Sequence, residues 1–225
     1  MDKAGIFTEG GIGKFFYTGN GKMKFSILYV DPPWQNRNGG SQGAACNIYN
    51  TMSIKDLCDL PVSKIGNLDS FLFLWACWPM LPEALELMKT WGYEYKTGGF
   101  VWIKARKNFN PDQLSFMPYE SLEEDSFFGL GNYTRANSEV CLLGRRGGPE
   151  RAAADVFQVI FAPLTRHSEK PPETRDRIVR LCGDLPRIEI FARQKAEGWE
   201  SIGNEITGRD IREDLDLIIK GNYDN

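Results

Sequence analysis

Short hydrophobic runs with the composition of buried strands recur along the chain. Residues 25–30 (Phe-Ser-Ile-Leu-Tyr-Val) are rich in β-branched and aromatic residues, which is typical of a strand covered on both faces. Further runs of this kind lie at residues 70–75, 100–103, 139–143, 155–161 and 187–193. The pattern predicts a strand at each of them.

Between these runs, apolar residues recur at helical spacing. Ser53 and Asp56 fit a capping box and predict a helix to about Leu60, where Pro61 ends it. Residues 81–92 predict a second helix of about ten residues. Similar patterns predict helices from His167 to about Cys182 and over residues 209–220.

The alternation of strands and helices predicts an α/β fold with a mostly parallel sheet and helices on both faces. We expect one domain over residues 1–225. Residues 1–24 are glycine-rich and without a clear period, so we expect a flexible lead-in. Residues 104–137 break the alternation with more than thirty residues of mixed charge. A loop of that length usually has a purpose, so we expect it to contact a substrate.

Composition restricts the classes of function. A net charge of −3 does not favour a general nucleic-acid binder, so any such surface must be a local basic patch. The five cysteines contain no C-x-x-C pair, which argues against a zinc site or a disulfide framework, and we expect no metal. No apolar run is long enough for a membrane span and no signal peptide is evident, so we expect a cytoplasmic protein.

The strongest candidate for chemistry is the corner Asp31-Pro32-Pro33-Trp34. Two prolines end the strand before them, which holds a carboxylate at the carboxyl end of a buried strand, where open α/β sheets bind ligands. The Asp31 carboxylate and the Pro32 carbonyl can each accept one hydrogen of an exocyclic base amine, and Trp34 offers a surface for stacking. The alternative is a strand end with a Pro-Pro turn and a tryptophan that covers the core.

This corner resembles the signature of the S-adenosylmethionine-dependent adenine methyltransferases, which include the messenger-RNA adenosine methyltransferase and bacterial and phage DNA-modifying enzymes. Other blocks resemble the same family in the same order. They lie at residues 49–53, 73–75, 131–139, 167–171, 188–193, 198–199 and 203–205. The similarity spans roughly residues 25–207. It implies a Rossmann-like methyltransferase fold with permuted motif order, in which the catalytic corner precedes the cofactor strand.

The resemblance also implies a role for each group of residues. The catalytic residues would be Asp31, Pro32, Pro33 and Trp34. The residues that bind S-adenosylmethionine would be Asp31, Lys170, Glu189, Arg193, Asn204 and Glu205. Lys170, beside the amino end of a helix, would meet the carboxylate of the methionyl part, and Asn204 and Glu205 would bind the ribose hydroxyls.

Substrate contacts are expected from residues with the chemistry to hold a flipped base and its phosphate. Tyr133, Arg135 and Asn137 supply an aromatic ring, a cation and an amide, although each alone is more often structural. The remaining candidates are Trp34, Lys170 and His167. For His167, the only histidine, a structural or substrate-contacting role is favoured over that of a base.

The sequence therefore predicts transfer of a methyl group from S-adenosylmethionine to the exocyclic amine of adenine in nucleic acid. The compact chain favours DNA over RNA and a bacterial or phage-infected host. The alternatives are an RNA adenosine methyltransferase and a catalytically silent, nucleic-acid-binding partner subunit. Because the chain is small, a homodimer is one way to provide more DNA-reading surface.

Overall fold

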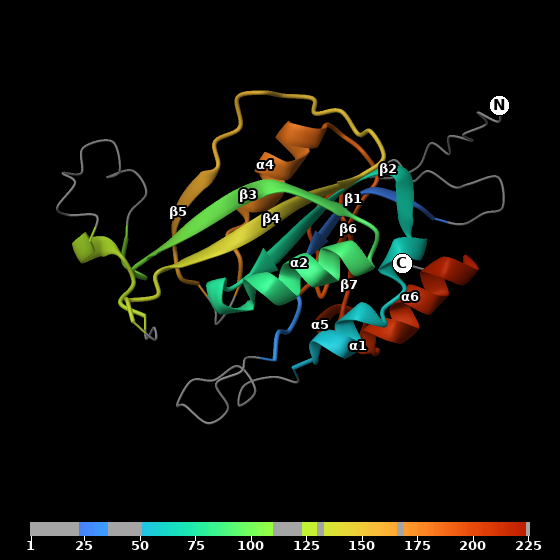
Figure 1. Cartoon of the computed structure of the whole chain (residues 1–225), viewed down its shortest axis with the longest axis horizontal. Helices are drawn as coiled ribbons and strands as arrows, with labels where there is room; N and C mark the ends of the chain where they lie inside the picture. The colour runs from blue at the N-terminus through green and yellow to red at the C-terminus, as the bar shows by residue number, and fades with distance from the viewer. Residues whose placement is uncertain (1–22, 36–50, 110–122, 130–132, 166–168, 224–225) are drawn as a thin grey trace.

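The computed structural model describes residues 23–35, 51–109, 123–129, 133–165 and 169–223. Within them, seven strands form one sheet in the order β5-β3-β4-β2-β1-β6-β7 (Figure 1). Their bounds are β1 Phe25–Val30, β2 Gly66–Ala76, β3 Glu94–Ala105, β4 Ser138–Arg146, β5 Val159–Pro163, β6 Arg187–Ile190 and β7 Glu200–Ile202.

All strands except β4 run in the same direction. β1 pairs in parallel with β2 on one side and β6 on the other, and β4 is antiparallel to both β2 and β3. The carboxyl ends of the parallel strands therefore meet at one edge of the sheet. Because β4 runs the opposite way, its beginning at Ser138 reaches that same edge. This mostly parallel sheet confirms the predicted fold class.

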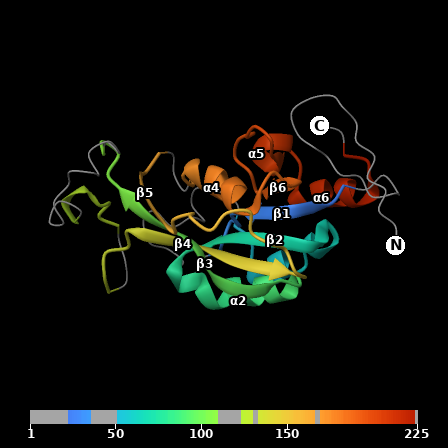
Figure 2. The ribbon, with the colours of Figure 1, turned by 90° about the horizontal axis from the view of Figure 1, so that it is seen from above.

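Helices cover both faces of the sheet (Figure 2 shows α4 and α2 on opposite sides). Side chains from α1 (Ile54–Cys58), α2 (Leu81–Thr90) and α6 (Ile211–Lys220) join one buried cluster. Side chains from α4 (Glu173–Cys182) join the other. Alternation along β1 assigns its residues to the two clusters in turn, with Leu28 and Val30 in the first and Ile27 and Tyr29 in the second.

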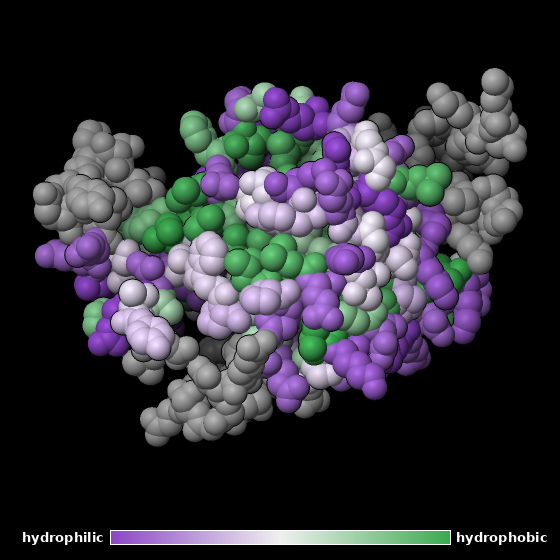
Figure 3. All heavy atoms as spheres, in the orientation of Figure 1, coloured by the Kyte–Doolittle hydropathy of each residue, from purple (hydrophilic) through white to green (hydrophobic). Residues whose placement is uncertain are grey.

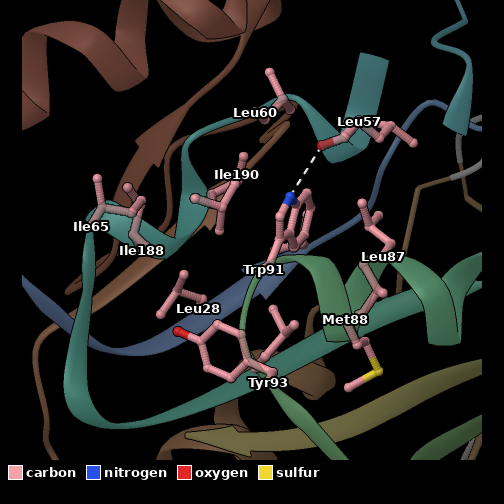
Figure 4. Packing of buried hydrophobic residues seen from close by; sticks show 14 of the residues in the cluster. Leu28, Leu57, Leu60, Ile65, Leu87, Met88, Trp91, Tyr93, Ile188 and Ile190 are labelled. Carbon is pink, nitrogen blue, oxygen red and sulfur yellow. Dashed lines mark hydrogen bonds between the residues drawn. The ribbon is translucent and has the colours of Figure 1, made fainter. Parts of the chain in front are cut away.

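The first of these clusters contains a buried indole with a hydrogen-bond partner. Trp91, which follows α2, donates its Nε1 hydrogen to the backbone carbonyl of Leu57 in α1 over 3.1 Å (Figure 4). Leu28, Ile188 and Ile190 from the adjacent strands β1 and β6 belong to the same cluster. An unpaired buried N–H costs about 1–3 kcal/mol, so this bond helps to determine how α1 and α2 pack.

Several predicted element bounds are confirmed and others are wrong. The α1 cap is confirmed, because the Ser53 hydroxyl accepts a hydrogen bond from the Asp56 amide over 3.1 Å. The helix expected from His167 begins only at Glu173. The reason is the pair Pro171-Pro172, since a residue that precedes a proline is pushed away from helical angles.

Two predicted strands also have different bounds. The strand predicted over residues 155–161 starts at Val159, where pairing with Val101 of β3 begins. The strand predicted over residues 187–193 stops at Ile190, because Phe191 has a φ of 63°, which is incompatible with a strand.

The surface differs between the two ends of the sheet. On the face in Figure 3, hydrophilic residues predominate over α6, whereas hydrophobic residues gather toward β3 and β5. Phe157 and Val159, at the edge strand β5, are both exposed.

Of the expected lead-in, residues 1–22 lie outside the described residues, while Met23 is buried in the core. In the described part of the chain no helix has the length and apolar character needed to cross a membrane.

Candidate active site

The corner after β1 is held by backbone hydrogen bonds. The Trp34 amide donates to the Pro32 carbonyl over 2.8 Å, and the Met52 amide donates to the Pro33 carbonyl over 2.8 Å. The Gln35 amide in turn donates to the Met52 carbonyl over 3.2 Å. A carbonyl oxygen has two lone pairs, so Pro32 keeps one acceptor position beyond its bond to Trp34. The corner is thus a rigid turn with acceptor capacity.

Trp34 is buried beneath this corner. Its side chain is 8% exposed and belongs to the hydrophobic cluster beneath α1 and α2. Its indole Nε1 donates to the backbone carbonyl of Trp75 in β2 over 3.0 Å. Of the two roles left open from the sequence, covering the core is therefore the better supported.

Four charged side chains of alternating sign lie in a chain beginning at Asp31. Oδ2 of Asp31 is 2.8 Å from Nζ of Lys170, which lies 3.2 Å from Oε2 of Glu139. Oε1 of Glu139 is 2.5 Å from Nζ of Lys104. The side chain of Lys170 is only 8% exposed. The order acid, base, acid, base compensates charges that would be costly to bury alone.

Period-two alternation explains why three of these residues share a face of the sheet. Each lies two residues from a member of the buried cluster packed against α4, and side chains at that spacing point the same way. The pairs are Tyr29 with Asp31, Cys141 with Glu139 and Trp102 with Lys104. Lys104 and Glu139 were missed from the sequence; a charged residue that continues a buried stripe was the available signal.

The electrostatics of the chain follow from burial and pairing. Burial raises the pKa of Asp31 above its usual value, although the ammonium of Lys170 opposes the shift. For Lys170, burial lowers the pKa, but Asp31 and Glu139 outweigh it, so the pKa is raised and the ammonium stays charged. For Glu139, burial raises the pKa, but Lys170 and Lys104 bring it below its usual value. Of the two acids in this chain of charges, Asp31 is thus the one whose ionised form is stabilised less by its cationic partners.

A cavity of about 360 Å³ opens beside the corner. Its size lies within the range of small-molecule sites, roughly 300–1,000 Å³. Asp31, Pro32 and Pro33 form one wall, and Met52 contributes an apolar side chain. The predicted catalytic corner therefore borders a ligand-sized space at the carboxyl edge of the sheet.

The opposite walls come from the ends of β6 and β7. Phe191 and Arg193 follow β6, while Asn204 and Glu205 begin α5 (Asn204–Thr207) after β7. Nε of Arg193 lies 2.9 Å from Oε1 of Glu205, which ties the two segments together. The approach between them is close, because a Cβ at Gly203 would lie 2.9 Å from the Ala192 carbonyl oxygen. Three predicted cofactor residues, Arg193, Asn204 and Glu205, thus line one cavity together with Asp31.

Glu189 has a partner of its own. Its carboxylate oxygens accept hydrogen bonds from Nε and Nη2 of Arg175 in α4, over 2.6 and 2.8 Å. Burial raises the pKa of Glu189, although the Arg175 guanidinium opposes the shift. Glu189 stands beside Tyr29 in the sheet and is not among the residues that line the cavity. Glu189 therefore lies in the sheet next to β1 and not on the wall of the cavity.

Three of the predicted substrate residues, Tyr133, Arg135 and Asn137, lie in a different region, just ahead of β4. The Lys104 amide donates to the Asn137 carbonyl over 2.7 Å, which connects Asn137 to the charged chain. The guanidinium of Arg135 lies 4.0 Å from the ring centre of Phe128, and Tyr133 is fully exposed. His167 lies outside the described residues.

Comparison with known proteins decides the family. The model of the MT-A70 family matches residues 25–205. The chain belongs to the MT-A70 family.

Relatives of this MT-A70 protein differ in how much of their length it covers. Type II methyltransferase M.MunI of Mycoplasma sp. is 30% identical over 210 residues, 84% of this chain and 81% of that protein. An Arabidopsis thaliana protein named N(6)-adenosine-methyltransferase MT-A70-like is 27% identical over 202 residues, which are 88% of this chain but 26% of that protein. Human N(6)-adenine-specific methyltransferase METTL4 is 26% identical over 196 residues, 83% of this chain and 38% of that protein. The chain thus spans most of the first and well under half of the other two.

The MT-A70 match and the cavity do not end at the same residue. The match stops at residue 205, whereas the cavity is also lined by the residues 208–211 that follow α5. These residues were not predicted to belong to the site. The local sequence pattern of a short turn between two helices does not indicate that the turn will line a cavity.

Proposed function

We propose that this MT-A70 protein transfers a methyl group from S-adenosylmethionine to the exocyclic amine of adenine in nucleic acid. The observation that carries the proposal is the position of Asp31 and Pro32. Two acceptors on one rigid turn line a ligand-sized cavity, at the carboxyl edge of a mostly parallel sheet.

The residues of the cavity fit S-adenosylmethionine, which supplies an electrophilic methyl group when bound. Asn204 and Glu205 are short polar side chains suited to ribose hydroxyls, and Met52 and Phe191 offer apolar contact to a purine. Lys170 and Glu189 already have charged partners in Asp31 and Arg175. Both remain proposed cofactor-binding residues, and these partners hold their side chains in place.

The catalytic role of the corner is to hold the amine of the target base. The Asp31 carboxylate accepts one amine hydrogen and the Pro32 carbonyl accepts the other, which directs the nitrogen lone pair toward the methyl group. As the nitrogen–carbon bond forms and the sulfur–carbon bond breaks, the nitrogen becomes positive. It then loses one proton, for which Asp31 is the adjacent ionised acceptor. In a duplex the base must first leave the stack, at a cost of a few kcal/mol.

We propose DNA as the substrate in preference to RNA. The type II methyltransferase M.MunI supports this preference, because it is 30% identical over 84% of this chain, whereas the plant N(6)-adenosine-methyltransferase is 27% identical. We further propose a bacterial or phage-infected host. We propose a homodimer as one way to provide more DNA-reading surface, and light scattering with and without DNA tests for it.

The test of this function is to incubate the protein with methyl-labelled S-adenosylmethionine and, separately, single-stranded DNA, duplex DNA and RNA. We expect label on adenine of DNA. Transfer to RNA alone would overturn the DNA assignment, and no transfer together with no heat on titration with S-adenosylmethionine would favour the silent partner subunit. Asp31→Ala should abolish transfer while cofactor affinity stays within about tenfold; turnover by this variant would mean that other groups hold the amine.

A further inference from the structure

One wall of the cavity is a turn whose position depends on a buried carboxylate. Gly208, Arg209, Asp210 and Ile211 line the cavity and connect α5 to α6. Gly208 ends α5 in the left-handed conformation with a φ of 71°, which reverses the chain there. The chain therefore reverses sharply between the two helices, and side-chain contacts from α6 support the turn.

That support comes from Asp214 in α6, whose side chain is 0% exposed. Its Oδ1 lies 2.8 Å from Nε of Arg209, and its Oδ2 accepts a hydrogen bond from the Thr207 hydroxyl over 2.8 Å. The Thr207 hydroxyl oxygen in turn accepts from the Arg209 amide over 3.2 Å. The two oxygens of a fully buried carboxylate are thus bonded to Thr207, the last residue of α5, and to Arg209 within the turn, which holds the turn against α6.

The position of this turn, directly after the proposed ribose-binding residues in the chain, indicates what it meets. In the proposed reaction the methyl group must lie at Asp31 and Pro32, and the ribose hydroxyls lie at Asn204 and Glu205. The adenine ring of the donor is attached to the ribose on the side away from the sulfonium. The turn at residues 208–211 lines the same cavity and directly follows α5, which begins with Asn204 and Glu205. An adenine ring attached to a ribose at these two residues can therefore meet the turn, together with the apolar residues Met52 and Phe191 of the same cavity.

We propose that the turn of residues 208–211 forms the adenine end of the methyl-donor site and that Asp214 is the positioning residue that holds it there. This inference rests on the proposed function, because it concerns the same cavity. It assigns donor recognition to a segment beyond the family match at residues 25–205. Asp214 acts through Arg209 and Thr207 and touches no reacting atom.

The test compares Asp214→Asn with Asp216→Asn in the full chain. Asp216 is an exposed residue of the same helix that pairs with Lys220, so it is a matched control. The probes are S-adenosylhomocysteine and 5′-methylthioadenosine, which keeps the adenosine half but lacks the amino acid group. We expect Asp214→Asn to raise the Kd of both probes about tenfold, equivalent to about 1.4 kcal/mol. The KM for S-adenosylmethionine should rise by a similar factor, with a much smaller change in kcat, and Asp216→Asn should match the wild type.

Two results would overturn the inference: an unchanged Kd, or a weaker Kd for S-adenosylhomocysteine alone, which would locate the loss at the amino acid end. If thermal unfolding shows that Asp214→Asn does not fold, Arg209→Ala replaces it, because Arg209 is one-third exposed and provides the other half of the pair. Arg209→Ala must then raise both Kd values. Failure of the proposed function looks different, since the wild-type protein would then bind neither probe.

Discussion

Asp31 and Asp214 are both aspartates paired with a cation beside the same cavity. They differ in how far away in the sequence their partners lie and in how exposed their side chains are. Asp214 takes its partners from residues 207 and 209 of its own neighbourhood in sequence, and no part of its side chain is exposed. Asp31 takes its cation from Lys170, 139 residues away, and its side chain stays 23% exposed beside the cavity. A local pair holds a turn, whereas a long-range pair sets the electrostatics of a reactive group.

The pKa of Asp31 shows what its burial costs in stability. Burial raises the pKa of Asp31 in the folded protein, so the contribution of this group to stability is present at low pH and is lost as the pH rises through the folded pKa. At neutral pH the ionised carboxylate therefore opposes folding, although the proposed chemistry needs it ionised. Such a conflict is typical of functional groups.

The largest difference between the two aspartates should appear in the rate of transfer. Asp31→Asn replaces an acceptor with an amide that cannot take the amine hydrogen in the same way, so single-turnover transfer should fall by about 10²–10³-fold. Binding of S-adenosylhomocysteine should stay within about tenfold of the wild type. Asp216→Asn is the control, and a rate above one tenth of the wild type would contradict the role of Asp31.

The order should reverse for stability. Asp214→Ala removes the partner of Arg209 and Thr207 and should lower the free energy of unfolding by about 1–3 kcal/mol. Asp31→Ala should lower it by less, because the ionised Asp31 carboxylate opposes folding at pH 7. Urea denaturation of both variants at pH 7 measures this difference. Equal losses in the free energy of unfolding would mean that the two aspartates contribute alike to stability.

Lys170→Gln should shift the pH dependence of activity. Lys170 lowers the pKa of Asp31, so its loss should move the acid limb of the kcat/KM profile to higher pH. At pH 7 the rate should fall by about tenfold, equivalent to about 1.4 kcal/mol, and recover as the pH rises. Measuring kcat/KM across the pH range, with the exposed Lys220→Gln as control, checks this. An acid limb that does not move would separate Lys170 from Asp31.

Glu139→Gln should have the smallest effect and the opposite sign. The negative charge of Glu139 raises the pKa of Asp31, so its removal should move the acid limb to lower pH. The rate at pH 7 should therefore rise, but by at most a few-fold, since the bond from Lys170 to Asp31 remains. The same pH profile tests it. If both variants moved the limb in the same direction, the alternating chain of charges would not control Asp31.

Local features of the sequence determined the first strand, the corner and the cap of α1. An apolar run followed by two prolines leaves the backbone few choices, and β1 does end at Val30 with Asp31 beside a cavity. The Ser53 cap likewise depends on residues three positions apart. The family blocks also extended to Asn204 and Glu205, which line that cavity.

Only the tertiary structure decided which side chains meet. The link from Asp31 through Lys170 and Glu139 to Lys104 depends on the order and register of strands far apart in the chain. The local sequence pattern contains no information about that order. The same holds for the burial of Trp34 and for the turn that completes the cavity. Backbone preference is set by neighbours in sequence, whereas side-chain pairing and pKa are set by neighbours in space. For this reason the acid could be located from the sequence, but its electrostatic surroundings could not.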